Sequence, residues 1–432
     1  MEFIRSIFIT DGKTEAAKLR NSTGAISDSS IQNIKSIMDE VKRYGDSAIL
    51  KYTKKLDGVQ LKTLKVTTEE IKQAYTRVSK GQIRSIAIMK KDLAKSERVL
   101  LSRLNGMVVS SNGIKLRRSV LPIPSVGCYI PGGKAHYPST VVMCAVPAKI
   151  AGVKRIVAIS PPMKNGNIDP LTLVAADICG IDEFYKVGGA QGIAALTNGT
   201  QSIPKVSKII GPGGIFVTIA KILASSRVSI DMVAGPTELI IYADSSANPV
   251  LIARDLISQA EHSFDTLCGL VTISSKLANE VSTQIRSIIE NDNISRRDIV
   301  KRSLESNGFS AVCNTESTAI EFVNEVAPEH LQIMTRDART AAKKITSAGL
   351  VLIGKYAPSS ASDYSFGSNH VLPTLGFAKS RASLSVLDFI KIVNTVEASK
   401  SGLADAEGVI KEIALAEGLL NHYQAVKERM KV

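Results

Sequence analysis

The stretch from residue 125 to residue 160 reads SVGCYIPGGKAHYPSTVVMCAVPAKIAGVKRIVAIS. It contains two short runs of strand-forming residues, 127–130 and 155–159. Between them lie a glycine-rich turn and the Ala-rich segment 142–152, whose composition is typical of a helix. A strand, a turn, a helix and a second strand form one βαβ unit, which predicts two neighbouring parallel strands.

The same alternation continues along the chain. Strand-like runs at 183–187 and 208–210 alternate with helical stretches at 171–180, 190–198 and 215–225. A second alternating block spans about 238–354, with strand-like runs at 239–242, 267–273, 331–334 and 350–353. We therefore predict an α/β fold in which two Rossmann-like parallel-sheet domains face a cleft. Residues 1–120 and the tail 385–432 read as mainly helical N-terminal and C-terminal elements.

Composition narrows the class of protein. The 432 residues are 44% hydrophobic, which excludes wholesale disorder. The five cysteines are widely spaced and form no CxxC, a pattern typical of reduced thiols in the cytoplasm. Residues 1–5 do not begin a secretory signal, and the apolar run 141–148 is too short to span a membrane. We therefore expect a cytoplasmic protein with no membrane partner.

The net charge of +14 is concentrated in one region. Residues 51–118 hold 17 Lys and Arg against five Asp and Glu. A nucleic-acid surface would explain this excess, but the basic residues are scattered singly or in pairs with little aromatic interleaving. A solvated helix face explains the segment 69–104 more simply, so we expect no nucleic-acid partner.

Glycine-rich turns follow several of the predicted strands, at 131–133, 188–189 and 211–214. Glycine lets a backbone approach phosphate closely, and the helix that follows offers free N–H groups. None of these turns is a GxGxxG, because Phe216 stands where the third glycine of the best match would lie. Tight turns between strand and helix therefore explain these glycines as well as a dinucleotide does.

Four polar segments could carry chemistry. Gln259 and His262 lie three residues apart, so on a helix they share one face and could bind one metal ion. Glu329 and His330 place a carboxylate beside an imidazole, a pair suited to proton transfer. The loop 362–370 and the helix end 417–422 add further polar groups. Taken alone, such segments are more often a surface pair, or a capping carboxylate with a buried histidine, than a functional site.

Together these segments resemble the histidinol dehydrogenase family. The resemblance covers essentially the whole chain, with the matching segments in the same order. They are 44–48 with 52–53, 127–133 with 137–140, 187–191, 208–213, 231–236, 259–263, 327–331, 363–364 with 369–374, and 417–422.

The resemblance implies the oxidation of L-histidinol to L-histidine through L-histidinaldehyde, with reduction of two NAD⁺ and one zinc ion per site. It places the zinc ligands at Gln259, His262, Asp363 and His422, and the catalytic pair at Glu329 and His330. It places substrate contacts at Thr237, Gln259, His262, His330, Asp363, His370, Glu417 and His422. NAD contacts fall at Tyr129, Gln191 and Gly214. In these roles His330 takes the alcohol proton, and Glu329 activates the water that hydrates the aldehyde.

The resemblance also implies a domain arrangement. It divides the chain into an N-terminal arm, 1–25, and a discontinuous α/β domain, 26–128 plus 236–378, which carries most zinc and catalytic residues. A second Rossmann-like domain, 129–235, forms the NAD side, and a helical dimerisation segment spans 379–432. In the implied intertwined homodimer, Glu417 and His422 complete the site of the partner subunit.

The sequence departs from the family pattern at four positions. Gly214 replaces a usual Asn, and Thr237 replaces a usual Ser but keeps the hydroxyl. Ser362 and Ser359 replace a common Gly and a frequent Glu in the loop before the metal-binding Asp. Two other functions remain possible from the sequence: a zinc dehydrogenase of another small alcohol, and a non-enzymatic zinc- or nucleic-acid-binding protein.

Overall fold

The computed structural model describes residues 3–21, 27–104, 106–132 and 136–432. These residues form two parallel sheets and a smaller antiparallel one. In spatial order the first sheet contains β1 (Arg5–Ile9), β11 (Gly308–Cys313), β10 (Leu267–Thr272), β9 (Glu238–Ala243), β12 (His330–Met334) and β13 (Leu350–Ile353). The second contains β6 (Glu183–Lys186), β5 (Arg155–Ser160), β4 (Ser125–Tyr129), β7 (Lys208–Ile210) and β8 (Ser229–Ile230). The predicted α/β fold with two parallel sheets is confirmed.

Helices cover both faces of the first sheet. Alternate residues of its strands point to opposite sides and so pack against different helices. Leu239 and Ile241 pack toward α10 (Pro249–Ala260), α11 (Ser275–Asn291) and α12 (Arg297–Asn307). Ile240 and Tyr242 pack toward α1 (Gly12–Asn21) and α13 (Glu316–Val326). The short helices α14 (Ala338–Ala342) and α15 (Ser359–Ser362) follow β12 and β13.

The second sheet is covered in the same way. Val126 and Cys128 pack toward α4 (Thr68–Tyr75), α5 (Lys80–Ser102), α6 (Pro138–Ala151) and α7 (Pro170–Cys179). Tyr129, Val157 and Ile159 pack toward α2 (Asp28–Tyr44), α3 (Asp46–Tyr52), α8 (Gly189–Asn198) and α9 (Ile215–Ala224). The π-helix η1 (Thr53–Asp57) continues α3.

This packing corrects the predicted grouping of residues 26–128 with 236–378. Helices α2 to α5 lie on the second sheet, where α2 contacts α8 and α9, α4 contacts α7, and α5 contacts α6. Strand β4 belongs to that sheet from Ser125 onward. Residues predicted as an N-terminal arm contribute β1 to the first sheet, paired with β11, and α1 packs on α13. An amphipathic pattern shows which helix face is buried but not which sheet buries it, so the sequences of α2 to α5 do not indicate that these helices cover the second sheet.

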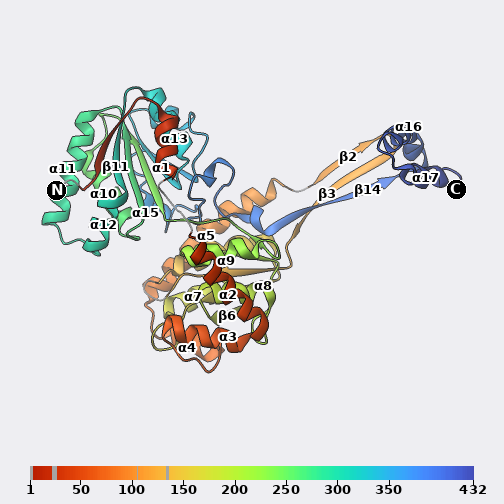
Figure 1. Ribbon diagram of the computed structural model, residues 1–432, viewed down its shortest axis with the longest axis horizontal. Helices are drawn as coiled ribbons and strands as arrows, with labels where there is room; N and C mark the ends of the chain where they lie inside the picture. Colours follow the sequence, from red (N-terminus) through yellow and green to blue (C-terminus); the bar gives the residue numbers. More distant parts are fainter. Residues whose placement is uncertain (1–2, 22–26, 105, 133–135) are drawn as a thin grey trace.

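An arm extends from this body (Figure 1). It consists of the antiparallel strands β2 (Met107–Ser111), β3 (Ile114–Pro122) and β14 (Ile390–Ala398), followed by α16 (Lys400–Ala416) and α17 (Leu420–Arg429). Two 3₁₀ turns, η2 (Phe377–Lys379) and η3 (Val386–Phe389), precede β14. Residues 1–120 and 385–432 are mainly helical, as predicted, but the prediction missed these three strands. Their residues are largely exposed, so the apolar pattern that marks a buried strand is weak.

Within the described ranges, no helix combines the length and the apolar character needed to cross a bilayer.

Candidate active site between the two sheets

A cleft with a volume of about 750 Å³ lies where the two sheets meet. From the second sheet it is lined by the turn 211–214 that follows β7. From the first sheet and its loops it is lined by the predicted site residues Thr237, Gln259, His262, Glu329, His330, Asp363 and His370. The cleft therefore joins the carboxyl end of the second sheet to the amino ends of β9 and β12 in the first.

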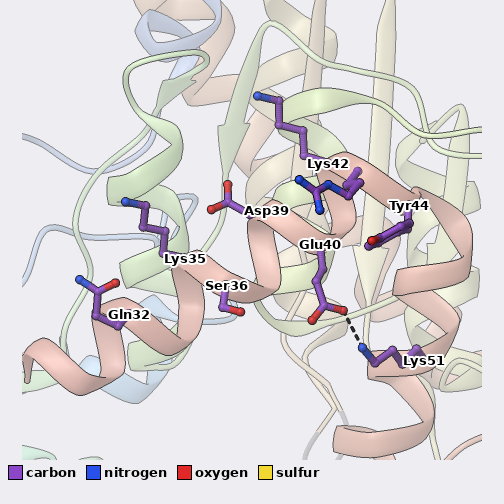
Figure 2. A pocket seen from close by; sticks show the side chains of 9 residues that line it. Gln32, Lys35, Ser36, Asp39, Glu40, Lys42, Tyr44 and Lys51 are labelled. Atoms are coloured by element: carbon purple, nitrogen blue, oxygen red, sulfur yellow. Dashed lines mark hydrogen bonds and ion pairs between the residues drawn. The ribbon is translucent and has the colours of Figure 1, made fainter.

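A second hollow, of about 970 Å³, lies beside α2 and α3 (Figure 2). Its lining is an open, charged helix surface with residues such as Lys35, Asp39 and Arg43. Lys51 and Glu40 are paired with each other there at 2.6 Å between Nζ and Oε2. The charged side chains of this hollow are mostly exposed to solvent, whereas the cleft contains buried polar side chains. The cleft is therefore the better candidate for an active site.

His330 is the first residue of β12 and is only 3% exposed. Its Nδ1 lies 3.2 Å from the backbone carbonyl oxygen of Glu238. A carbonyl oxygen can only accept, so Nδ1 carries the proton and donates it, and the neutral ring then has its lone pair on Nε2. Nε2 has no hydrogen-bond partner among the described residues, although it is buried. The fold therefore presents His330 as a base with one free nitrogen.

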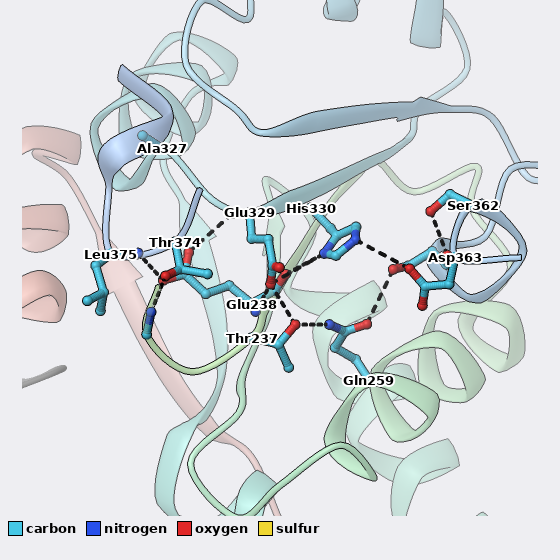
Figure 3. A network of polar contacts seen from close by, with 12 residues as sticks. Thr237, Glu238, Gln259, Ala327, Glu329, His330, Ser362, Asp363, Thr374 and Leu375 are labelled. Carbon is cyan, nitrogen blue, oxygen red and sulfur yellow. Dashed lines mark hydrogen bonds and ion pairs between the residues drawn. The ribbon is translucent and has the colours of Figure 1, made fainter. Parts of the chain in front are cut away.

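Glu329 is held by the strand that runs beside it. Its Oε2 accepts hydrogen bonds from the Thr237 hydroxyl at 2.5 Å and from the Glu238 backbone N–H at 2.7 Å. Thr237 in turn accepts from the Gln259 side-chain amide at 2.8 Å (Figure 3). This chain of contacts fixes the carboxylate and turns the oxygen of Gln259 toward Ser359, whose hydroxyl donates to it at 3.3 Å.

His330 and His370 have opposite pKa shifts. Burial alone would lower the pKa of His330, but the carboxylates of Glu329 and Asp363 outweigh it and raise that pKa above 6.5. Glu329 Oε2 is 3.6 Å from Nδ1, and Asp363 Oδ1 is 3.8 Å from Nε2. Burial dominates at His370 and lowers its pKa, so this ring favours the neutral form. Its Nδ1 donates to the Asp363 carbonyl oxygen at 3.0 Å.

Three of the four predicted zinc ligands come together. Gln259 and His262 lie at the end of α10 and just beyond it, and Asp363 follows α15. The fourth, His422, lies on α17 at the tip of the arm, as does Glu417 at the end of α16 (Figure 1). Both are exposed and neither lines the cleft of their own chain. Across the described part of one chain, no three His, Cys, Asp or Glu side chains form a metal-binding group.

The predicted NAD contacts are divided between the cleft and the core beside it. Gly214 lines the cleft. Tyr129 and Gln191 are buried next to Gly189, whose backbone N–H donates to the Tyr129 hydroxyl at 3.3 Å. The side-chain oxygen of Gln191 is buried without a hydrogen-bond partner in the described structure. Burial raises the pKa of Tyr129 to about 12, so its hydroxyl stays neutral.

Sequence reasoning missed a pair of residues that supports the site. The Arg20 guanidinium donates to both carboxylate oxygens of Glu238, at 2.5 and 2.9 Å. Glu238 also accepts from the Glu329 backbone N–H at 3.2 Å, and its own backbone holds both catalytic candidates. A lone Glu before the apolar run 239–243 was the available signal, because a buried carboxylate requires a partner.

Two positions that depart from the family pattern contribute to the loop. The Ser359 hydroxyl reaches Gln259, and the Ser362 hydroxyl donates to the Ser359 carbonyl at 2.7 Å. The loop that carries Asp363 is thus tied to α10 by serine hydroxyls.

The sequence is similar to known proteins over nearly its whole length. The family model described as histidinol dehydrogenase matches residues 21–430. The chain is 43% identical over 425 residues to a histidinol dehydrogenase of Clostridium acetobutylicum, covering 98% of this chain and 97% of that protein. It is 41% identical over 419 residues to that of Methanocaldococcus jannaschii, covering 97% of each.

A solved structure of the same kind of protein is also similar. The crystal structure of histidinol dehydrogenase from Elizabethkingia anophelis superposes with a TM-score of 0.94 at 34% identity, covering 100% of this chain and 99% of that one. The agreement extends over both sheets and the arm. The chain therefore belongs to the histidinol dehydrogenase family and is an oxidoreductase of histidine biosynthesis.

Proposed function

We propose that the cleft carries out the zinc-dependent four-electron oxidation of L-histidinol to L-histidine through L-histidinaldehyde, with reduction of two NAD⁺. The observation that carries this proposal is the pairing of a base whose protonation site is fixed, His330, with a fixed carboxylate, Glu329, in a cleft. Alcohol oxidation needs a group that removes the hydroxyl proton, and aldehyde oxidation needs a water added first.

His330 takes the proton in the first step. Its free Nε2 accepts the hydroxyl proton of histidinol while the C–H bond of the same carbon breaks and a hydride, a hydrogen with two electrons, leaves, which gives histidinaldehyde. The resulting imidazolium lies between the Glu329 and Asp363 carboxylates, which stabilise its positive charge.

Glu329 acts in the second step. The hydrogen bonds of its described side chain fall on Oε2, so the other oxygen can orient and deprotonate a water. Addition of that water to the aldehyde gives the hydrate, whose oxidation yields the carboxylate of L-histidine.

The donor set in the cleft suits a zinc ion. Gln259, His262 and Asp363 offer an amide oxygen, an imidazole and a carboxylate from one chain, and His422 of a second copy would supply the fourth ligand. When bound, zinc would supply a Lewis acid that polarises the alcohol and holds a nitrogen of the substrate. Thr237, His330 and His370 would contact the substrate from the same chain, and Glu417 from the second copy.

The second sheet has features that suit the binding of a dinucleotide. The turn 211–214 lines the cleft with three glycines and one proline, and the unpartnered oxygen of Gln191 beside Tyr129 is suited to accept a hydrogen bond from a ligand. When bound, NAD⁺ would accept the two electrons released in each step.

We further infer a homodimer with shared sites. The arm places Glu417 and His422 away from the cleft of their own chain, so a second copy must bring them to it. Exposed apolar side chains along the arm favour a protein partner over water; they are Val108, Val109, Ile392, Val396, Val409, Ile413, Leu419 and Leu420. We place this enzyme in the cytoplasm, since its five cysteines are free and buried.

The deciding experiment measures NADH formed per histidinol consumed. We expect about two NADH per histidinol, because each step releases two electrons. Prolonged zinc chelation should abolish turnover and added zinc should restore it. Turnover with another small alcohol but not with histidinol would favour the competing assignment to a related zinc dehydrogenase.

Glu329→Gln separates the two steps. It should slow oxidation of supplied histidinaldehyde by about 100-fold or more, and oxidation of histidinol much less. Equal losses in both steps would contradict the water-activating role.

A further inference from the structure

A buried ion pair lies behind the glycine turn 211–214 of the second sheet. Lys221, on α9, is 2% exposed, and Asp231, which follows β8, is fully buried. The Lys221 ammonium contacts Asp231 Oδ1. Neither residue has a role in the proton transfers described above.

Both members of the pair bind the backbone of the same residue, Gly211. Lys221 Nζ donates to the Gly211 carbonyl oxygen at 3.0 Å, and the Gly211 N–H donates to Asp231 Oδ2 at 2.7 Å. Gly211 has a φ of +109°, and a Cβ there would lie 2.2 Å from the Tyr129 carbonyl oxygen. The first residue of the turn is therefore held from two sides by charged groups and packed on a third against β4.

Further contacts hold Asp231 itself. The Met232 backbone N–H donates to Oδ1 at 2.6 Å, and Arg381 donates to the Asp231 carbonyl oxygen. A buried ion pair is often no more stabilising than apolar residues of the same volume, so stability alone is a weak reason for this arrangement. Its hydrogen bonds instead set the position of one backbone segment, and that segment lines the cleft.

We propose that Lys221 and Asp231 are positioning residues that hold the turn 211–214 in the shape that receives the dinucleotide. This inference rests on the proposed NAD⁺-dependent function. Lys221 acts through Gly211 and does not line the cleft, whereas Asp231, although fully buried, lies at the cleft wall. The two charges cancel, so the pair shapes the turn without adding net charge to it. Loss of the pair should weaken dinucleotide binding and leave histidinol binding unchanged.

Lys221→Met tests this, with Lys208→Met as the matched control. Lys208 lies in β7, near the turn in sequence, and is also largely buried in an ion pair, with Asp388 at 3.0 Å. Its contacts are to Asp388 and not to the turn. Both variants lose a lysine ion pair of the same sheet, but only Lys221→Met frees Gly211.

The readouts are the Kd of NADH by fluorescence and the KM values of NAD⁺ and histidinol. We expect Lys221→Met to raise the Kd of NADH and the KM of NAD⁺ by about tenfold or more. The KM of histidinol, kcat at saturating NAD⁺, and all values for Lys208→Met should stay within about twofold of wild type. Equal NADH binding by Lys221→Met and wild type would overturn the inference alone. A wild-type enzyme that neither binds NADH nor reduces NAD⁺ with histidinol would overturn the proposed function as well.

A double variant, Lys221→Met with Asp231→Leu, guards against simple loss of folding. It removes both charges, so none is left buried and unpaired, and Tm should approach that of wild type. The Kd of NADH should remain about tenfold higher than that of wild type, because neither side chain binds the Gly211 backbone any longer. Recovery of wild-type NADH affinity together with Tm would show that the pair is merely structural and overturn the positioning role.

Discussion

His330 lies between two carboxylates, one near each ring nitrogen. Both favour the imidazolium, and their effect exceeds the opposing effect of burial. The two carboxylates raise the pKa of His330, so its ring stays protonated up to a higher pH. A protonated ring cannot accept the alcohol proton. The pH dependence of activity therefore reports on this environment.

We expect kcat/KM for histidinol oxidation to fall with decreasing pH along an acid limb whose pKa is above 6.5. Glu329→Gln should move this limb to lower pH, because it removes a negative charge 3.6 Å from Nδ1 and so lowers the pKa of His330. The measurement is a pH–rate profile of the histidinol-to-aldehyde step alone. A limb that keeps its position in the variant would mean that another group controls it.

Gly214 shows what a single missing side chain changes. It is the N-cap of α9 and provides no side-chain cap, and a Cβ there would meet nothing within 4 Å. Its φ of −66° suits any residue. An asparagine would therefore fit, cap the helix and reach into the cleft.

Gly214→Asn should raise stability by a few tenths of a kcal/mol, since glycine is already a tolerable N-cap. It should also lower the Kd of NADH, by about twofold to tenfold, if the amide gains one hydrogen bond to the cofactor. Thermal unfolding and NADH fluorescence measure the two effects separately. A weaker NADH complex in a stable variant would contradict this use of the position.

At the scale of elements, helix α1 is part of the site although it contacts no substrate group. Arg20 near its end pairs with Glu238 at the start of β9, and Glu238 holds both Glu329 and His330 through its backbone. The carboxylate of Glu238 is buried, so removing its guanidinium partner leaves a charge without adequate compensation.

Arg20→Met should therefore lower the free energy of unfolding by about 3–5 kcal/mol. Lys18→Met, on the same helix, removes only an exposed pair with Glu15 and should change it by less than about 1 kcal/mol. Urea unfolding of both variants provides the comparison. Similar small losses would show that the Arg20–Glu238 pair contributes little.

Elements differed in how well the sequence predicted them. Strands β5 and β9 were expected within a residue or so of where they occur, because buried parallel strands read as continuous apolar runs. Strands β2 and β3 were missed, although Asn112 and Gly113 form the turn between them with φ of 46° and 72°, the signature of a two-residue hairpin. Strand β14 was missed because its partner, β3, lies far away in sequence.

The site shows the same limit. Glu329 and His330 are adjacent in sequence, and Gln259 and His262 share a helix end, so local spacing marked them as candidates and the ordered resemblance along the chain selected them. The contact of Arg20 with Glu238 spans 218 positions, and that of Lys221 with Gly211 depends on a turn conformation. Such contacts follow from the tertiary fold and leave no local pattern in the sequence.

For the whole molecule, the cleft combines opposite ends of two similar sheets. The second sheet contributes its carboxyl end, where ligands usually bind in open α/β sheets. The first contributes the amino ends of β9 and β12, where Thr237 and His330 lie. One sheet can thus receive a dinucleotide while the other presents the acid–base groups, and in the proposed homodimer the arm would complete a neighbouring cleft.

Shared sites can be tested by combining two inactive subunits. With formation of histidine from histidinol as the assay, Glu329→Gln and His422→Asn should each inactivate a homodimer, since every site contains the defect. In a heterodimer purified through two different tags, one site collects both defects and the other has neither. Such a heterodimer should have about half the activity of the wild-type dimer, because one of its two symmetric sites is intact. If His422 instead served the cleft of its own chain, each subunit of the heterodimer would carry one defect and no activity would return.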